Sequence, residues 1–367
     1  MRISLVLGAA LALGAGCGTA DPTVRDAGAT DQPIIGAACA QAPTFTEDLA
    51  SCNATATDYQ PRDNNSANDT WATCISDDGS YHKIEASVSS IARVQAYDAI
   101  GLKLWADGAE PTFQDFFDMR VLFEEEQGLG SRVARRYDVH YDPPATGKCD
   151  EDGVADANPD YCVGPATLQP LIVAAFADGS AGRDRLVNAA KIRAAIQWFM
   201  YVSSVKEGTT CTDSPKDCDS CWAYYSGGTD RDTPIGLAAD IRALSPETHD
   251  RAFDGVLAVR CWRDLDQSIP AGDAAMRDRA VAQLDAAVVR GMAILIRQRF
   301  AALACSTVDY QRAEHEALRI LVPLFDRETR ARDAATADLL LAEVAKDASA
   351  IDVSGVLAAI DATYPCP

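Results

Sequence analysis

The chain has 367 residues, of which 48% are hydrophobic, and its formal net charge is −21. This acidity argues against nucleic acid and against an anionic membrane surface as partners, and it favours cationic partners. About 330 residues follow the N-terminal segments described next, which is enough for one large domain or two small ones with a buried core.

The N-terminal residues predict export. Residues 1–17 contain one Arg, an apolar run from Ile3 to Leu13, and small residues up to Cys17. This pattern indicates a lipoprotein-type signal peptide, too short to span a membrane, with a plain signal peptide as the alternative. Cys17 is then the lipid attachment site, and the small, polar residues 18–38 form a disordered tether. We expect an exported protein, lipid-anchored to the cell envelope at the outer membrane or periplasmic face, with no other membrane contact.

Helical periodicity dominates from residue 81 onward. Thr112 with Asp115, and Ser245 with Pro246, mark two helix starts. The expected helices cover 82–105, 112–127, 131–142, 166–177, 183–206, 245–265, 273–304, 307–323, 328–347 and 354–362. No alternating strand pattern appears, so we predict an all-α fold, a multi-helix bundle with two disulfide-pinned Cys-rich loops over 143–165 and 208–235. This helical domain covers 39–367, with a weak boundary expected near 143–165.

The cysteines are expected to pair. Eleven of the 12 Cys residues remain when Cys17 is set aside, and disulfides are the default state in an exported protein. We expect about five disulfides and one odd thiol. Cys149 and Cys162 are spaced as a short closed loop. A zinc site at Cys211, Cys218 and Cys221 is the alternative, and it requires reduced thiols.

The first candidate site lies on both sides of a tight turn at Gly128–Gly130. Three carboxylates end the preceding helix, where the helix dipole disfavours negative charge. They are Glu124, Glu125 and Glu126. In one interpretation Arg132, Arg135 and Arg136 neutralise them. In the other they face a bound cation together with Tyr137 and His140, because Tyr137, His140 and Tyr141 share one face of the expected helix.

Two further candidates lie on expected helices. His82 and Glu85 are spaced i and i+3, as helical bundles often present metal ligands, although most such pairs lie at the surface. Glu314 is on an apolar helical face with His315 at its border. A carboxylate there needs a partner, either a cation or an Arg from elsewhere. Glu316 has Arg312 and Arg319 at helical spacing, so it is expected to be solvated and paired.

The loop from Asp150 to Asp160 is a minor candidate for Ca²⁺. It has oxygen-bearing side chains at Asp150, Asp152, Asp156, Asn158 and Asp160. The spacing departs from a calcium loop, because Val154 stands where the third ligand belongs. We therefore interpret the segment as a polar disulfide loop.

Four stretches occur in an order that resembles the low-iron-inducible periplasmic proteins of algae and bacteria, the iron-assimilation family. They are SSIARVQAYDAIGLKLW, LFEEEQGLGSRVARRYDVHY, CWAYYSGG and AEHEALRILVPLF. The resemblance covers most of residues 81–330. It implies a helical exported protein that captures iron, with Glu124 to Glu126, Tyr137, Asp138, His140, Glu314 and His315 as the carried-over residues. A second likeness, to imelysin-like iron-regulated proteins, depends on His82 and Glu85.

We therefore expect an exported, surface-anchored metal-binding protein that supports iron acquisition and is not an enzyme. Ferric rather than ferrous iron is expected, because carboxylate, phenolate and imidazole donors suit a hard cation. A membrane transporter is the expected partner, and nucleic acid is not. The alternatives are an exported metal-dependent hydrolase and a disulfide-stabilised scaffold for protein partners without metal.

Overall fold

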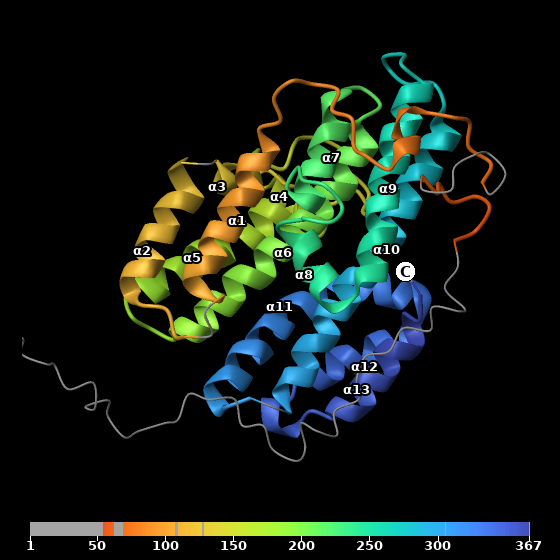
Figure 1. The fold of residues 1–367 in the computed structure, drawn as a ribbon. Coiled ribbons are helices and arrows are strands. Elements are labelled where there is room, and N and C mark those ends of the chain that lie inside the picture. Colours follow the sequence, from red (N-terminus) through yellow and green to blue (C-terminus); the bar gives the residue numbers. More distant parts are fainter. Residues whose placement is uncertain (1–53, 62–68, 107–108, 127, 305, 367) are drawn as a thin grey trace, which may run out of the picture. The chain divides into compact units, whose positions relative to one another are not determined.

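Helices build the part of the chain that the structure describes (Figure 1). The computed structural model describes residues 54–61, 69–106, 109–126, 128–304 and 306–366. No strand occurs within these ranges, which confirms the all-α prediction. The helices are α1 (Ser90–Leu104), α2 (Phe113–Val121), α3 (Leu129–Val133), α4 (Val154–Ala157), α5 (Gln169–Ser180), α6 (Arg185–Thr210), α7 (Lys216–Ser226), α8 (Leu237–Leu244), α9 (Pro246–Leu265), α10 (Ala274–Leu303), α11 (Val308–Arg332), α12 (Ala334–Val344) and α13 (Val353–Thr363).

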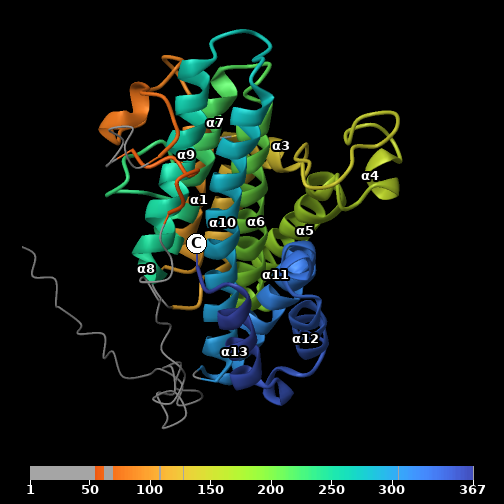
Figure 2. The ribbon, with the colours of Figure 1, turned by 90° about the vertical axis from the view of Figure 1, so that its right-hand side faces the viewer.

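Four long helices, α6, α9, α10 and α11, surround the core. Figure 2 shows α6, α9 and α10 running side by side, with α12 and α13 packed at one end against α11 and α10. Large side chains such as Phe199, Trp262 and Phe300 are fully buried between them. Each such side chain contributes about 1.5–3 kcal/mol by leaving water. The core therefore lies where the longest apolar stretches of the sequence meet.

The caps confirm two of the expected helix starts. The Thr112 hydroxyl accepts a hydrogen bond from the Asp115 N–H while the Asp115 side chain returns to the Thr112 backbone. Ser245 caps α9 through the Thr248 N–H. A side-chain oxygen in this position satisfies an N–H group that the helix itself leaves unpaired. The sequence was sufficient to predict these two helix starts, because the capping side chain and the N–H group that it binds lie within one helical turn.

The segment expected to be helical over 82–105 becomes a helix only at Ser90. The N–H groups of Ile84 and Glu85 both donate to the Asp219 carboxylate, at 3.0 and 2.7 Å. These hydrogen bonds tie the segment to α7 as a loop. The prediction that His82 and Glu85 share a helical face is therefore wrong.

The prediction of a helix over 131–142 is also wrong for most of that range, because α3 ends at Val133. The Asp138 N–H donates to the Tyr161 carbonyl at 2.8 Å, and the Gly164 N–H donates to the Arg136 carbonyl at 2.9 Å. Gly164 allows this close approach, since a Cβ there would lie 2.1 Å from the Val133 carbonyl oxygen. Backbone pairing with a distant segment thus replaces the helical bonds.

Two other expectations need correction. Residues 208–235 were expected to be a loop, but they contain α7, whose aromatic and small side chains are buried. The helix expected to stop at Pro323 continues to Arg332 as α11. Pro removes one backbone donor and strains a helix interior, but the packing of α11 on α6 and α10 keeps the element helical through it.

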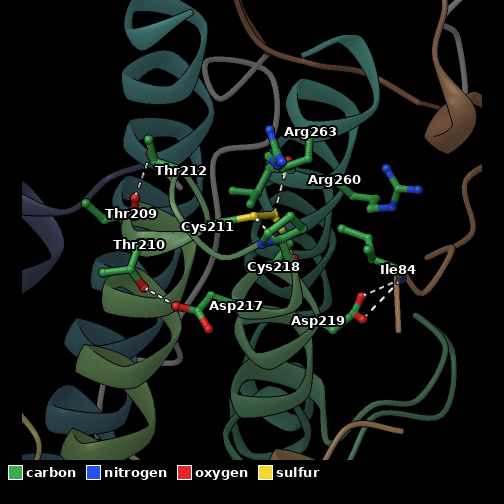
Figure 3. Close-up of a disulfide and its surroundings, with 12 residues drawn as sticks. Ile84, Thr209, Thr210, Cys211, Thr212, Asp217, Cys218, Asp219, Arg260 and Arg263 are labelled. Carbon is green, nitrogen blue, oxygen red and sulfur yellow. Dashed lines mark hydrogen bonds between the residues drawn. A yellow bond between two sulfur atoms is a disulfide. The ribbon is translucent and has the colours of Figure 1, made fainter. Parts of the chain in front are cut away.

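Among the described residues, disulfides join Cys74 to Cys261, Cys149 to Cys162 and Cys211 to Cys218. The Cys149–Cys162 prediction is confirmed. Figure 3 shows Cys211–Cys218 at the start of α7, and this bond removes two of the thiolates that a zinc site there requires. Cys366 is also disulfide-bonded. Among the described cysteines Cys221 is a buried free thiol, and burial raises its pKa.

Within the described ranges, no helix has both the length and the apolar character to cross a membrane. The predicted signal peptide, the lipid attachment site Cys17 and the tether over 18–38 all lie outside the described residues.

Candidate functional site

His140, one of the predicted metal ligands, lies between two carboxylates from different parts of the chain. Its Nδ1 is 2.6 Å from Asp138 Oδ1, and its Nε2 is 3.2 Å from Asp285 Oδ1 on α10. The Tyr201 hydroxyl on α6 donates to the same Asp285 oxygen at 3.0 Å. The rings of His140 and Tyr201 stack, with centroids 5.8 Å apart. We call Asp138, His140, Tyr201 and Asp285 the His140 cluster.

The irregular segment after α3 positions this cluster. Arg136 is buried and donates from Nη1 to Glu207 Oε1 on α6 at 2.9 Å, which fixes the segment on one side of His140. The Asp138 backbone is held by the Tyr161 carbonyl, and Asp138 Oδ1 also accepts the His140 N–H at 3.0 Å. The Asp138 carboxylate therefore orients both the backbone of residues 138–140 and the His140 imidazole.

The cluster holds a buried positive charge. Burial by itself lowers the pKa of His140, but the hydrogen bonds and charges of Asp138 and Asp285 outweigh it and raise the pKa to about 10. The imidazole is then an imidazolium at neutral pH, and its side chain is only 12% exposed. Burial and the charge of Asp285 raise the pKa of Tyr201 well above its usual value, so this phenol keeps its proton.

A second layer of acid and phenol groups surrounds the cluster. Burial, with the charges of Asp138 and Asp160, raises the pKa of Tyr141 to about 12. Glu328 on α11 also raises the pKa of Tyr141 and of Tyr201. Glu328 is itself paired with Arg327, and Arg332 Nη1 lies 3.5 Å from its Oε2. The surroundings thus combine hard oxygen donors with balancing cations.

Tyr137 does not join His140. Its ring stacks on Tyr161 with centroids 5.0 Å apart, and the Lys206 ammonium lies 5.7 Å from its ring centre. The expected common face of Tyr137, His140 and Tyr141 is absent because residues 136–141 are not helical. In this stretch only Asp138 and His140 meet among the predicted ligands.

Glu124 and Glu125 are exposed. Glu124 Oε1 accepts from Arg120 Nε at 3.0 Å, one helical turn earlier. Two of the arginines expected to neutralise these glutamates bind other groups. Arg136 binds Glu207, and Arg135 donates to the Ser131 carbonyl. The backbone of Glu126 belongs to the π-helical turn Leu122–Glu126, and its side chain lies outside the described part of the chain.

The other two candidate pairs lie apart from the cluster. His82 Nε2 is 2.8 Å from Asp78 Oδ2, while Glu85 has an exposed side chain.

Glu314 accepts from Arg299 Nη1 at 2.7 Å, and the ring of His315 bonds the Val344 carbonyl at 3.0 Å. The partner that a carboxylate on this face needs is thus an Arg from α10. Glu316 pairs with Arg319, as expected, and with Lys191 in place of Arg312.

The Asp150–Asp160 loop contains a helical turn, α4, at its centre. Asp150, Asp152, Asp156 and Asp160 are exposed, and the Asn158 amide donates to the Val154 carbonyl. Across the ranges that the structure describes, no three His, Cys, Asp or Glu side chains are grouped so that they could hold a metal ion as they stand. This applies to the His140 cluster as well, whose groups are joined by the His140–Asp138 and Tyr201–Asp285 hydrogen bonds and by the His140–Asp285 ion pair.

Sequence reasoning missed Asp285 and Tyr201. A signal for Asp285 was present, because Val288, Val289 and Met292 follow it at helical spacing and are buried. An acid on such an apolar face needs a partner. His249, at the start of α9, is buried between the Tyr225 hydroxyl and the Arg231 carbonyl, and burial lowers its pKa.

Comparison with known proteins adds no relative. No family model, no curated protein and no solved structure matches the chain, so its resemblance to the iron-assimilation family remains a prediction.

Proposed function

We propose that the protein is an exported metal-binding protein, that its cargo is ferric iron, and that the His140 cluster is the binding site. One observation supports this proposal above the others: a buried cation, the His140 imidazolium, is held between Asp138 and Asp285 with a phenol on the second carboxylate. A buried place for one positive charge, lined by oxygen atoms, suits a hard metal ion.

Metal binding at this cluster competes with protons. His140 ligates only as the neutral imidazole, so its proton must leave and the carboxylates must close on the ion. Because the pKa of His140 is raised to about 10, removing the proton at pH 7 costs roughly 4 kcal/mol. A trivalent ion gains more from two carboxylates than a divalent ion does, which favours ferric iron. Affinity should therefore rise with pH across the neutral range.

Titration with iron supplied as a soluble ferric chelate tests the proposal. Asp285→Asn and His140→Gln keep the approximate shape but remove ligand charge or basicity, so each should weaken binding at least tenfold, or ~1.4 kcal/mol. Glu316→Gln is the control, because Glu316 pairs with Lys191 and Arg319. Proton release on binding, measured in buffers of different ionisation enthalpy, gives a second readout. Equal affinity in all three variants would exclude the cluster as the site.

We further propose export with a lipid anchor on Cys17. The support is the apolar run that ends in small residues and Cys. Replacement of Cys17 by Ser should move the protein from membrane fractions to the soluble exported fraction. Membrane association that persists in this variant would contradict the anchor.

The proposed role is capture without turnover, with a membrane transporter as the partner that receives the metal. Two carboxylates, Asp138 and Asp285, contact His140, and the charge of Glu328 acts on the neighbouring Tyr201; such acidic surroundings suit reversible cation binding. Hydrolysis of a panel of ester and phosphoester substrates by the iron-loaded protein, lost in Asp285→Asn, would show an enzyme instead.

A further inference from the structure

A polar cavity of about 280 Å³ lies between the start of α1, α3, α6 and the start of α7, separate from the His140 cluster. Seven charged side chains line it, with serine hydroxyls and the Tyr224 phenol. The cations are Arg93, Arg132, Lys206 and Lys216, and the carboxylates are Glu207, Asp217 and Asp219. In a chain with a net charge of −21, a cavity with more cations than carboxylates is unexpected.

The three carboxylates pair with Lys206 and Arg136 or accept from uncharged groups, and within the described residues none of them pairs with Arg93, Arg132 or Lys216. Glu207 binds Arg136 and Lys206, at 2.9 and 3.1 Å. Figure 3 shows the Asp219 carboxylate held by the Ile84 N–H and the Asp217 carboxylate by the Thr210 hydroxyl. Asp219 also accepts from the Tyr81 hydroxyl at 3.0 Å. These carboxylates therefore neutralise Lys206 but not the other three cations that line the cavity.

The remaining cations lack such partners. In the part of the chain that the structure describes, Arg93, Arg132 and Lys216 form no ion pair, and the Nε atoms of both arginines are buried without a hydrogen-bond partner. Within the described residues, Arg93 donates hydrogen bonds to neutral hydroxyls, Ser90 Oγ at 3.2 Å and the Tyr224 hydroxyl at 3.5 Å. A buried donor without an acceptor costs about 1–3 kcal/mol. An anion in the cavity would supply the missing acceptors.

The start of α1 adds donors of the same kind. This 15-residue helix has Ser89 at its N-cap without a side-chain cap, and its first turn contains no acidic residue. Its first N–H groups and the positive end of its dipole favour an anion. Ser87, Ser89, Ser90 and Ser220 line the same cavity. The Asp217 pKa is raised by burial and by Glu207, so this acid takes up a proton more readily beside further negative charge.

We propose that this cavity binds a small phosphate-bearing solute, either inorganic phosphate or a small phosphate ester. Two guanidinium groups, two ammonium groups and several hydroxyls offer more donors than one carboxylate accepts, and a tetrahedral oxyanion accepts on all of its oxygens. The volume exceeds what a single water molecule needs, which leaves room for an organic group. This site does not depend on the proposed iron site, because the two share no residue.

Calorimetric titration of the whole exported chain in metal-free buffer tests the proposal, with inorganic phosphate and glycerol phosphate as separate probes. Chloride is used to keep the ionic strength constant. Wild type should bind at least one probe, and that probe should raise its melting temperature by mass action. Tighter binding of the ester would identify an organic phosphate as the natural class, and equal or weaker binding would identify inorganic phosphate.

Matched variants locate the site. Lys216→Gln, at an exposed position, and Arg132→Gln should each weaken phosphate binding about tenfold or more, while Arg132→Lys should restore part of it. Arg135→Gln is the control, since Arg135 is exposed, lies in the same segment and donates to the Ser131 carbonyl. Phosphate binding unchanged in His140→Gln separates this site from the iron site. Absence of binding to wild type, or equal loss in Arg135→Gln, would overturn the proposal.

Discussion

At the scale of single residues, His140 shows how two carboxylates determine the charge of a third group. Asp138 is two residues away in the chain and Asp285 is on another helix, yet both contact the imidazole. Burial opposes the charged form, and the two carboxylates favour it more strongly. Because His140 is charged when it pairs with Asp138 and Asp285, its contribution to the stability of the fold depends on pH.

The sign of this dependence follows from the raised pKa. The pKa of His140 is about 10 in the folded protein and 6.5 in the reference state, so its contribution is complete below pH 6.5 and is lost as the pH rises toward 10. The contribution is at most roughly 5 kcal/mol. In urea unfolding of metal-free protein, the stability difference between wild type and His140→Gln should shrink between pH 6.5 and 10.

A surface histidine provides the control for this measurement. His82 has a side chain 38% exposed and pairs with Asp78, and an exposed pair of this kind contributes about 0–1 kcal/mol. His82→Gln should therefore remain close to wild type at every pH. A His140→Gln variant whose stability follows wild type in parallel from pH 6 to 10 would show that the imidazole is not charged in the cluster.

At the scale of elements, helix packing is decided where two backbones approach closely. A Cβ at Gly255 on α9 would lie 2.4 Å from the Leu284 Cα on α10. A Cβ at Gly208 on α6 would instead meet the Cys221 sulfur at 3.5 Å, an ordinary contact. Both glycines are buried inside long helices, so they differ mainly in the space around them.

Alanine substitutions at these two glycines should have opposite effects. Gly255→Ala forces α9 and α10 apart and should destabilise the protein by about 1–3 kcal/mol. Gly208→Ala gains helix propensity without a clash and should stabilise it by up to about 1 kcal/mol. Thermal unfolding of both variants measures the difference. Equal effects of the two substitutions would show that the α9–α10 contact does not limit the packing.

At the scale of the whole molecule, disulfides join segments far apart in the sequence. Cys74–Cys261 links residues separated by 187 positions, whereas Cys149–Cys162 closes a loop with a separation of 13. In the chain-entropy description a bond that closes a longer loop restricts the unfolded chain more. The first bond ties the segment before α1 to α9 across much of the chain.

Removal of these disulfides should therefore differ in cost. Replacing both Cys74 and Cys261 by Ser should destabilise the protein by about 5 kcal/mol, and replacing both Cys149 and Cys162 by about 3 kcal/mol. Urea unfolding of the two double variants under one set of non-reducing conditions measures the order. The reverse order would show that native contacts, not loop closure, dominate the contribution of the disulfides.

The sequence by itself determined the helical class, the two caps at Thr112 and Ser245, and the Cys149–Cys162 bond. All of these depend on groups close together in the chain, whose spacing can be read directly. It also indicated that Glu314 needs a partner, which is Arg299.

Only the tertiary structure decided which groups meet at the candidate sites. Asp219 holds the loop containing His82 and Glu85, and Tyr161 holds the segment containing His140, so neither segment forms the helix that its own pattern favours. Asp285 reaches His140 from α10, and Arg132 faces a cavity formed by four elements. Backbone amides bond to whatever acceptor the fold brings near, and a partner from outside the local segment leaves no periodic trace in the local sequence.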